Sequence, residues 1–151
     1  MRNATLCFIR DENKILLGMK KKGFGAGKYN GFGGKVENGE TIEAAALREL
    51  REESGLMVEN AKKSAVLTFK FPHKPEWDQV VHVFTADTWA GNPIETDEMK
   101  PEWFDIENIP FSKMWTDDPH WLPHVLAGKF VTATFAFSPD ESILKKNIKV
   151  E

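Results

Sequence analysis

Three glutamates that lie close together in the sequence are the residues most able to do chemistry. Glu49, Glu52 and Glu53 follow a stretch with helical apolar spacing, and at about 100° per residue they fall within an arc of about 100°. Like charges this close repel one another, so a cation is expected to hold them together. Carboxylate oxygens suit Mg²⁺ or Mn²⁺, which commonly act with phosphate substrates. The cluster therefore predicts a divalent-metal site for phosphate chemistry.

The helix that carries these acids also has an apolar side. Its apolar positions recur at i, i+4 and i+8, namely Ile42, Ala46 and Leu50. Glu53 projects into the angular range of this stripe, whereas Glu49 and Glu52 lie at its edge. A carboxylate that leans toward a core carries a large desolvation cost unless it is paired or metal-bound. The alternative is a solvated surface helix whose acids are neutralised by Arg48 and Arg51.

The segments that flank this helix favour the metal site. Residues 23–34, upstream of it, hold six of the eleven glycines of the chain, so the backbone can turn sharply and approach a ligand closely. Glycine-rich backbone before a helix is a common phosphate-binding arrangement, although glycine richness alone is weak evidence. Downstream, Gly55 is expected to end the helix as a C′ residue.

The segment from Gly34 to Leu56 has a distinctive spacing. It reads Gly, five residues, Glu, seven residues, then Arg-Glu-Leu-x-Glu-Glu-x-Gly-Leu. This pattern resembles the Nudix box of the Nudix hydrolases, which binds divalent metal ions and activates water to cleave a nucleoside diphosphate linked to another group. The resemblance implies that the metal ligands are Glu49, Glu52, Glu53 and the backbone carbonyl of Gly33. It also implies structural roles for Glu40 and Arg48, paired with each other to brace the loop, and for Gly55.

The resemblance extends beyond the box, to a branch of the family that hydrolyses oxidised purine nucleoside triphosphates. The segments that carry it are 18–35, 97–101, 103–104 and 114–118. By this resemblance Glu98 approaches the metal site as a further catalytic ligand, Asn30 and the Asp117-Asp118 pair read the base edge, and Trp115 stacks on the base. The other residues implied to bind substrate are Thr5, Lys20, Phe24, Phe32, Gly33, Gly34, Lys35, Phe69, Phe71 and Trp121.

The activity that this branch implies is Mg²⁺-dependent hydrolysis of nucleotides such as 8-oxo-dGTP and 2-hydroxy-dATP. Attack at the β-phosphorus would release a nucleoside monophosphate and pyrophosphate, which would sanitise the nucleotide pool and avoid DNA damage. Two departures from the branch bear on base preference. Tyr29 stands where the mammalian member has Trp, and the turn 72–79 differs in sequence and by one residue in length.

The residues around Trp115 favour a purine pocket on physical grounds as well. Trp115 lies near two acids, and an aromatic ring in polar company suits an amphipathic ligand. Adjacent Asp117 and Asp118 repel each other if both ionise in a confined site, so one pKa is expected to rise and leave a neutral donor beside a charged acceptor. The alternative is that the aspartates cap a turn before Pro119 and that Trp115 is a core residue.

Other functions remain open at this point. One is a Nudix pyrophosphatase for an undamaged nucleoside triphosphate, a capped RNA end or a nucleotide sugar. Another is a non-catalytic nucleotide sensor that has kept the fold, although no box carboxylate is lost. Lys20 could steady the phosphates as a point charge, but Lys20, Lys21 and Lys22 could equally form a solvated basic edge.

Composition indicates a small globular enzyme. The 151 residues suit a single domain spanning 1–151, and the net charge of −3 argues against a grip on polymeric nucleic acid but not against one free nucleotide. The lone Cys7 is expected to be a buried strand residue. No apolar run has the length to span a membrane, and no signal-peptide pattern is present, so we expect a cytoplasmic protein, as a monomer.

The elements that must position these residues alternate in type. Strands are predicted at Thr5–Ile9, Lys14–Gly18, Ala65–Phe71, Val80–Asp87, Met99–Phe104, Phe130–Phe137 and Ser142–Val150, the last two as a hairpin. Helices are predicted at about Thr41–Ser54 and Pro119–Ala127. Strands with two helices on opposite faces fit an α/β/α sandwich with a mixed sheet, which the Nudix resemblance also implies.

Overall fold

A computed structural model describes all residues from Met1 to Glu151. The strands are β1 (Arg2–Asp11), β2 (Lys14–Lys20), β3 (Tyr29–Asn30), β4 (Lys62–Lys70), β5 (Gln79–Ala86), β6 (Met99–Asp105), β7 (Val131–Phe137) and β8 (Ile143–Val150). The α-helices are α1 (Ile42–Ser54) and α2 (Asp118–Leu126). Short 3₁₀ helices span Pro75–Trp77, Ile106–Asn108 and Phe111–Lys113.

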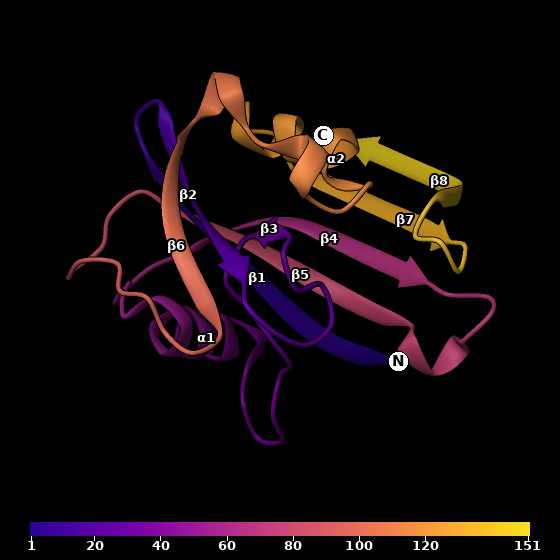
Figure 1. The fold of residues 1–151 in the computed structure, drawn as a ribbon, viewed down its shortest axis with the longest axis horizontal. Coiled ribbons are helices and arrows are strands. Elements are labelled where there is room, and N and C mark those ends of the chain that lie inside the picture. The colour runs from indigo at the N-terminus through magenta and orange to yellow at the C-terminus, as the bar shows by residue number, and fades with distance from the viewer.

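The strands form one mixed sheet. Its order is β3-β2-β1-β5-β4-β7-β8, and β6 pairs with β2 off this path. The β1–β5 and β4–β7 pairs are parallel, whereas the other pairs are antiparallel. Helices α1 and α2 lie on opposite sides of the sheet (Figure 1). The expected α/β/α sandwich with a mixed sheet is confirmed.

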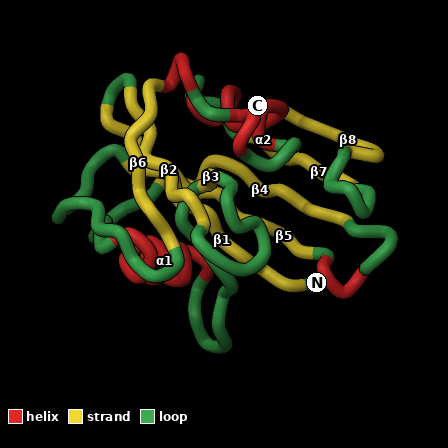
Figure 2. Tube along the Cα trace, in the orientation of Figure 1, coloured by secondary structure: helices red, strands yellow, loops and turns green.

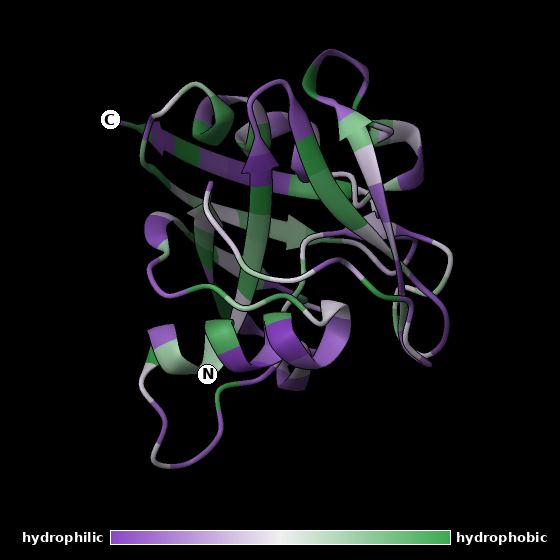
Figure 3. Ribbon diagram, turned by 90° about the vertical axis from the view of Figure 1, so that its left-hand side faces the viewer, coloured by the Kyte–Doolittle hydropathy of each residue, from purple (hydrophilic) through white to green (hydrophobic).

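Each face of the sheet has its own apolar core. The α1-side core packs Ala46 and Leu50 of the helix against sheet residues that include Cys7 and Ile9. The α2-side core packs Trp121, Leu122 and Val125 of the helix against sheet residues that include Phe8. Residues 7, 8 and 9 alternate between the cores because successive side chains of a strand point to opposite faces. Figure 3 shows that α1 itself combines hydrophobic and hydrophilic residues, as an amphipathic helix does.

Helix α1 begins and ends as the sequence predicts. The side chain of Thr41 caps the first turn by accepting a hydrogen bond from the Ala44 backbone N–H at 3.1 Å. Gly55 ends the helix with φ +78°, and its N–H donates to the Arg51 carbonyl. This left-handed conformation favours glycine, so the acidic face of the helix stops at a defined residue.

The largest differences from the sequence prediction come from non-local pairing. Strand β1 begins at Arg2 rather than Thr5 because Arg2–Ile9 pairs residue by residue with the parallel strand Gln79–Ala86. Strand β3 was not predicted, since its two residues are extended only by pairing with β2. The short 3₁₀ helices lie in the connections between long strands. Figure 2 colours the helices red and the strands yellow. None of the helices is long and apolar enough to cross a membrane.

Candidate active site

A cleft of about 570 Å³ extends from the glycine-rich loop to the start of α2. Its floor contains side chains of β1, β5 and β4, among them Ala4, Val81 and Phe69. Glu53 of α1 lies at one end of the lining, and the pair Asp117 and Asp118 lies at the other. The predicted metal-binding helix and the predicted base-reading residues therefore open into one cavity.

The glycine-rich loop is pressed directly against β1. The Thr5 backbone N–H donates to the Gly34 carbonyl at 2.8 Å. A Cβ at Gly33 would lie 1.7 Å from the Thr5 carbonyl oxygen, and a Cβ at Gly34 would lie 2.6 Å from the Glu49 carboxyl carbon. A larger residue at Gly33 would clash with the backbone of β1, whereas one at Gly34 would displace the Glu49 carboxylate.

The three helix glutamates differ in burial as the helical wheel predicts. Glu53 is the most enclosed, and its carboxylate accepts a hydrogen bond from the Gly33 N–H at 2.9 Å. Burial, with the charges of Glu49 and Glu98, raises the pKa of Glu53 to about 7, although the Gly33 hydrogen bond acts in the opposite direction. Burial also raises the pKa of Glu49, whose side chain is 16 % exposed, whereas the side chain of Glu52 is 56 % exposed. Carboxylate charge is therefore concentrated where solvent is partly excluded.

Arg48 is the brace between the loop and the helix. Its guanidinium donates to both oxygens of Glu40, at 2.7 and 2.9 Å, and to the Lys35 carbonyl at 3.1 Å. The hydrogen bonds from Arg48, followed by that from the Glu37 N–H, lower the pKa of Glu40 to about 2. The predicted Glu40–Arg48 pair is confirmed. Arg48 also contacts Glu49 at 2.9 Å and Glu52 at 3.2 Å, as the alternative of a salt-bridged helix predicts in part.

Two buried aspartates form the opposite end of the cleft, at the N-terminus of α2. Asp117 and Asp118 are only 3 % and 2 % exposed. Asp117 accepts a hydrogen bond from the Trp121 indole N–H at 2.7 Å, whereas Oδ2 of Asp118 has no partner. Burial raises the pKa of Asp117 to about 6 and, together with the charge of Asp117, raises the pKa of Asp118 well above its usual value. Both shifts favour a protonated carboxyl in this pair, which would offer a donor beside an acceptor.

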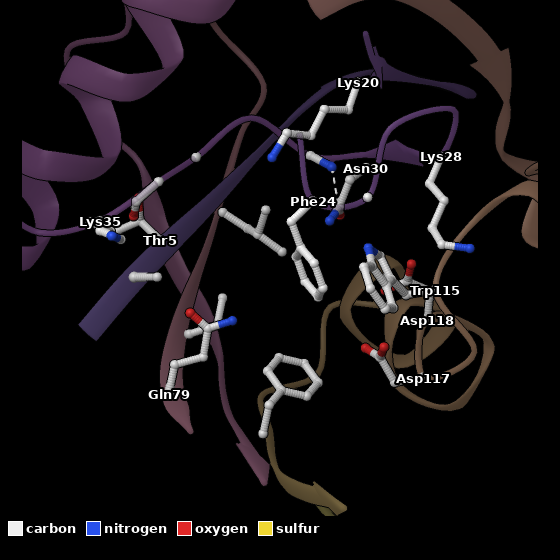
Figure 4. A pocket seen from close by; sticks show the side chains of 18 of the residues that line it. Thr5, Lys20, Phe24, Lys28, Asn30, Lys35, Gln79, Trp115, Asp117 and Asp118 are labelled. Atoms are coloured by element: carbon white, nitrogen blue, oxygen red, sulfur yellow. Dashed lines mark hydrogen bonds between the residues drawn. The ribbon is translucent and has the colours of Figure 1, made fainter. Parts of the chain in front are cut away.

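Aromatic side chains and a lysine surround the same end of the cleft (Figure 4). The rings of Phe24 and Trp115 are 5.1 Å apart, and Phe24 is 55 % exposed. Lys28 Nζ lies 5.2 Å from the centre of the Trp115 ring. Asn30 fixes its side-chain oxygen by accepting from the Gly31 N–H at 2.8 Å, which leaves its NH₂ group for a ligand. The arrangement suits a flat, amphipathic ring such as a nucleobase.

Comparison with known proteins identifies the family. The NUDIX domain matches residues 1–125. The chain belongs to the Nudix family. It is 50% identical over 144 residues to the "Oxidized purine nucleoside triphosphate hydrolase" of Danio rerio, covering 95% of this chain and 92% of that protein. It is 46% identical over 148 residues to the Mus musculus protein of the same name, covering 98% and 94%.

A solved Nudix structure agrees with the fold over the whole chain. The "mMutator MutT protein" of Bacillus halodurans superimposes with a TM-score of 0.88 at 25% sequence identity, and the match covers 99% of this chain and 98% of that one. The likeness supports the sheet order and the placement of both helices.

Nudix hydrolases generally need divalent cations, and the residues of this Nudix helix fit one by their chemistry. A buried carboxylate with a raised pKa loses its desolvation penalty when a cation binds it, and Glu53 is in this position. The Gly33 carbonyl accepts no hydrogen bond, so it is available as a further oxygen ligand. No three His, Cys, Asp or Glu side chains lie close enough together to form a metal-binding cluster. Arg48 contacts Glu49 and Glu52, so a cation bound by these carboxylates would share them with the guanidinium.

The structure brings most of the residues expected to bind substrate into the cleft of this Nudix fold. Those that line it are Thr5, Lys20, Phe24, Asn30, Gly33, Gly34, Lys35, Phe69, Phe71, Trp115, Asp117 and Asp118. Glu98 is exposed outside the lining, but its charge acts on Glu53. Its predicted approach to the metal therefore remains a prediction.

Two expected substrate residues do not line the cleft. Phe32 is fully buried in the α1-side core, where it packs under the Nudix helix. Trp121 is fully buried in the α2-side core and contacts Asp117 from below. Both lie next to lining residues in the chain or in space. A resemblance based on sequence therefore does not distinguish a residue behind the wall of the cleft from one that contacts the ligand. Trp121 therefore does not line the cleft as expected, and substrate binding by Phe32 or Trp121 stays a prediction.

Of the two departures from the branch pattern, one lies away from the cleft and the other contributes to it. Tyr29 does not line the cleft; its ring packs on Phe104 and its hydroxyl donates to Glu102 at 3.1 Å. The turn 72–79 does contribute, through Trp77 and Gln79. Sequence reasoning missed these two residues as well as Lys28 and Phe137, because their proximity to the cleft depends on how distant segments fold together.

The stability of the metal-free Nudix protein is expected to fall as pH rises from about 4.5 to about 7. The folded-state pKa of Glu53 is raised from 4.5 to about 7, so folding favours its protonated form, and this contribution is lost as pH rises through about 7. The raised pKa values of Asp117 and Asp118 act in the same direction. The Glu53 shift corresponds to about 3 kcal/mol. Urea unfolding across this pH range, with a chelator present, measures the effect.

The Glu53→Gln variant provides the comparison for this measurement. Glu53→Gln cannot titrate, so its stability curve should be flatter than that of the wild type by the Glu53 share, while the slope from the aspartates remains. Identical curves for the two proteins would show that the pKa of Glu53 is not raised.

Proposed function

We propose that this protein hydrolyses oxidised purine nucleoside triphosphates, of the 8-oxo-dGTP and 2-hydroxy-dATP type, to the nucleoside monophosphate and pyrophosphate. The observation that carries the proposal is the single cleft that joins the Nudix glutamates to a buried, proton-sharing aspartate pair. The names of the Danio rerio and Mus musculus relatives support the same substrate class.

The base end supplies selectivity for the purine. The Asp117-Asp118 pair and the free NH₂ group of Asn30 offer donors and acceptors to the edge of the ring. Trp115 and Phe24 provide faces for stacking. Since the aspartate pair holds a proton that it can place on either carboxyl, the same residues can meet the different edges of oxidised guanine and oxidised adenine.

The other end supplies the hydrolytic chemistry. Glu49, Glu52, Glu53 and the Gly33 carbonyl would hold Mg²⁺, with Glu98 as a further ligand and Mn²⁺ as a substitute. Bound Mg²⁺ supplies neutralisation of phosphate charge and activation of water for attack at the β-phosphorus. Lys20, at the edge of the cleft, orients the phosphates as a point charge. Arg48 holds the loop and helix in register through Glu40.

We further infer that the protein acts on free nucleotides, as a cytoplasmic monomer. The net charge of −3 supports a small ligand over a nucleic-acid polymer, whose binding typically needs a basic surface. Removal of oxidised nucleotides before polymerisation would protect DNA from damage.

A hydrolysis panel tests the proposed activity directly. With Mg²⁺ present, kcat/KM for 8-oxo-dGTP and 2-hydroxy-dATP should exceed that for dGTP and dATP by about tenfold or more, because the site has hydrogen-bonding groups to match the oxidised bases. Chromatography should detect a monophosphate and pyrophosphate, and a chelator should abolish turnover. Preference for dGTP, dATP or a nucleotide sugar in the same panel would overturn the assignment of substrate.

A further inference from the structure

Gln79, the first residue of β5, is a polar residue in the floor of the cleft. Strand pairing across β1, β5, β4 and β7 aligns Arg2, Gln79, Phe69 and Phe135 in one row and Ala4, Val81, Leu67 and Ala133 in the next. Directly paired residues point to the same face of a sheet. Gln79 is therefore flanked by Phe69 on β4 and followed by Val81 on its own strand, both of which line the cleft.

The carboxamide of Gln79 is free to contact a ligand. The side chain is only half-buried and forms no hydrogen bond with the other side chains drawn in Figure 4. It lies across the cleft from Trp115, Asp117 and Asp118, and its amide group points into the space between them (Figure 4). A ring held at the aspartates by one edge would thus present its opposite edge to Gln79.

The opposite edge of a purine is the one that oxidation at C8 changes. An unmodified purine has an acceptor at N7 and a C–H at C8, whereas an 8-oxo purine has an N–H donor at N7 and a carbonyl acceptor at C8. A carboxamide carries an acceptor and a donor side by side, and so can pair with both groups of the oxidised edge.

We propose that Gln79 is a specificity-determining residue that binds the N7–H and C8 carbonyl of 8-oxo purines. The inference rests on the proposed function, which it deepens. Asn30 and the aspartates select the purine by its pyrimidine-ring edge, and Gln79 selects its oxidation at the imidazole edge. An unmodified purine offers only the N7 acceptor at this edge, so the amide can form one hydrogen bond with it instead of two, at a cost in relative transition-state binding.

Gln79→Met tests this assignment, since Met retains the length of the side chain and removes both hydrogen-bonding groups. The kcat/KM ratio of 8-oxo-dGTP to dGTP should fall about three- to tenfold, the range expected for loss of neutral hydrogen bonds. The ratio of 2-hydroxy-dATP to dATP should not change, because that oxidation is on the other edge of the purine. Gln79→Glu, which can still accept from the N7–H of the 8-oxo purine and repels the N7 acceptor of dGTP, should keep the first ratio at or above the value that Gln79→Met gives.

The control is Val80→Met, on the same strand but on the opposite face of the sheet, which should leave both ratios unchanged. If Gln79→Met leaves the 8-oxo-dGTP ratio intact, or lowers both ratios equally, the inference is wrong while the proposed function stands. A wild-type enzyme with no preference for 8-oxo-dGTP over dGTP would overturn the proposed function, and the role of Gln79 with it.

Discussion

Glu53→Gln is expected to lower kcat by about 10²- to 10⁴-fold, the largest effect of any single change in the helix. Gln has nearly the volume of Glu but no negative charge, so it can neither hold a cation nor accept a proton. Because Glu53 is enclosed between the helix and the Gly33 N–H, no other side chain can take its place. Steady-state kcat with saturating Mg²⁺ and 8-oxo-dGTP measures the loss.

A matched control for this variant is Glu43→Gln in the first turn of the same helix. Glu43 is exposed and lies outside the cleft, so its replacement should leave kcat unchanged. Circular dichroism should show that both variants retain the fold. Near-normal turnover in Glu53→Gln would refute the assignment of this residue to the chemistry.

Asp118→Asn is expected to lower kcat/KM for 8-oxo-dGTP by about 10²-fold, with little effect on metal binding. The side chain of the variant cannot exchange a proton with Asp117. Its amide has a fixed donor and a fixed acceptor, whereas two carboxyl groups can pass one proton between them. Stability should be unchanged or higher, because a buried carboxylate with a raised pKa is replaced by a neutral group. The measurements are kcat/KM for each nucleotide of the panel and the midpoint of thermal unfolding.

Asp105→Asn serves as the control, since Asp105 is an exposed residue that pairs with Lys14 at the far end of β6. It should alter no kinetic constant. An equal loss of kcat/KM on all nucleotides in Asp118→Asn would show that the residue supports the fold of the cleft and does not read the base.

The sequence predicts best those parts of the molecule that are determined locally. The start of the helix near Thr41, its stop at Gly55 and the inward position of Glu53 all follow from spacing within one segment, and the structure has all three. The start of β1 at Arg2 could not be predicted, because it depends on pairing with Gln79, which lies 77 positions later in the chain.

The candidate site shows the same division. The resemblance supplied most residues that line the cleft, but it could not distinguish Trp115, which faces the cavity, from Trp121, which is buried below it. Both are tryptophans close to the aspartate pair in sequence, and only the turn of α2 decides which one a ligand meets. Gln79 had no local signal at all, since its position in the cleft is a property of the sheet.

The contact between the glycine-rich loop and β1 sets the length of ligand that the cleft can process. A Cβ at Gly33 would clash with the Thr5 backbone, and the Thr5 N–H donates to the Gly34 carbonyl, so the loop is held directly against β1. With its base fixed at α2, a nucleotide can offer only one position along its phosphate chain to the glutamates. With the proposed function, the bond that breaks would thus be selected by its distance from the base.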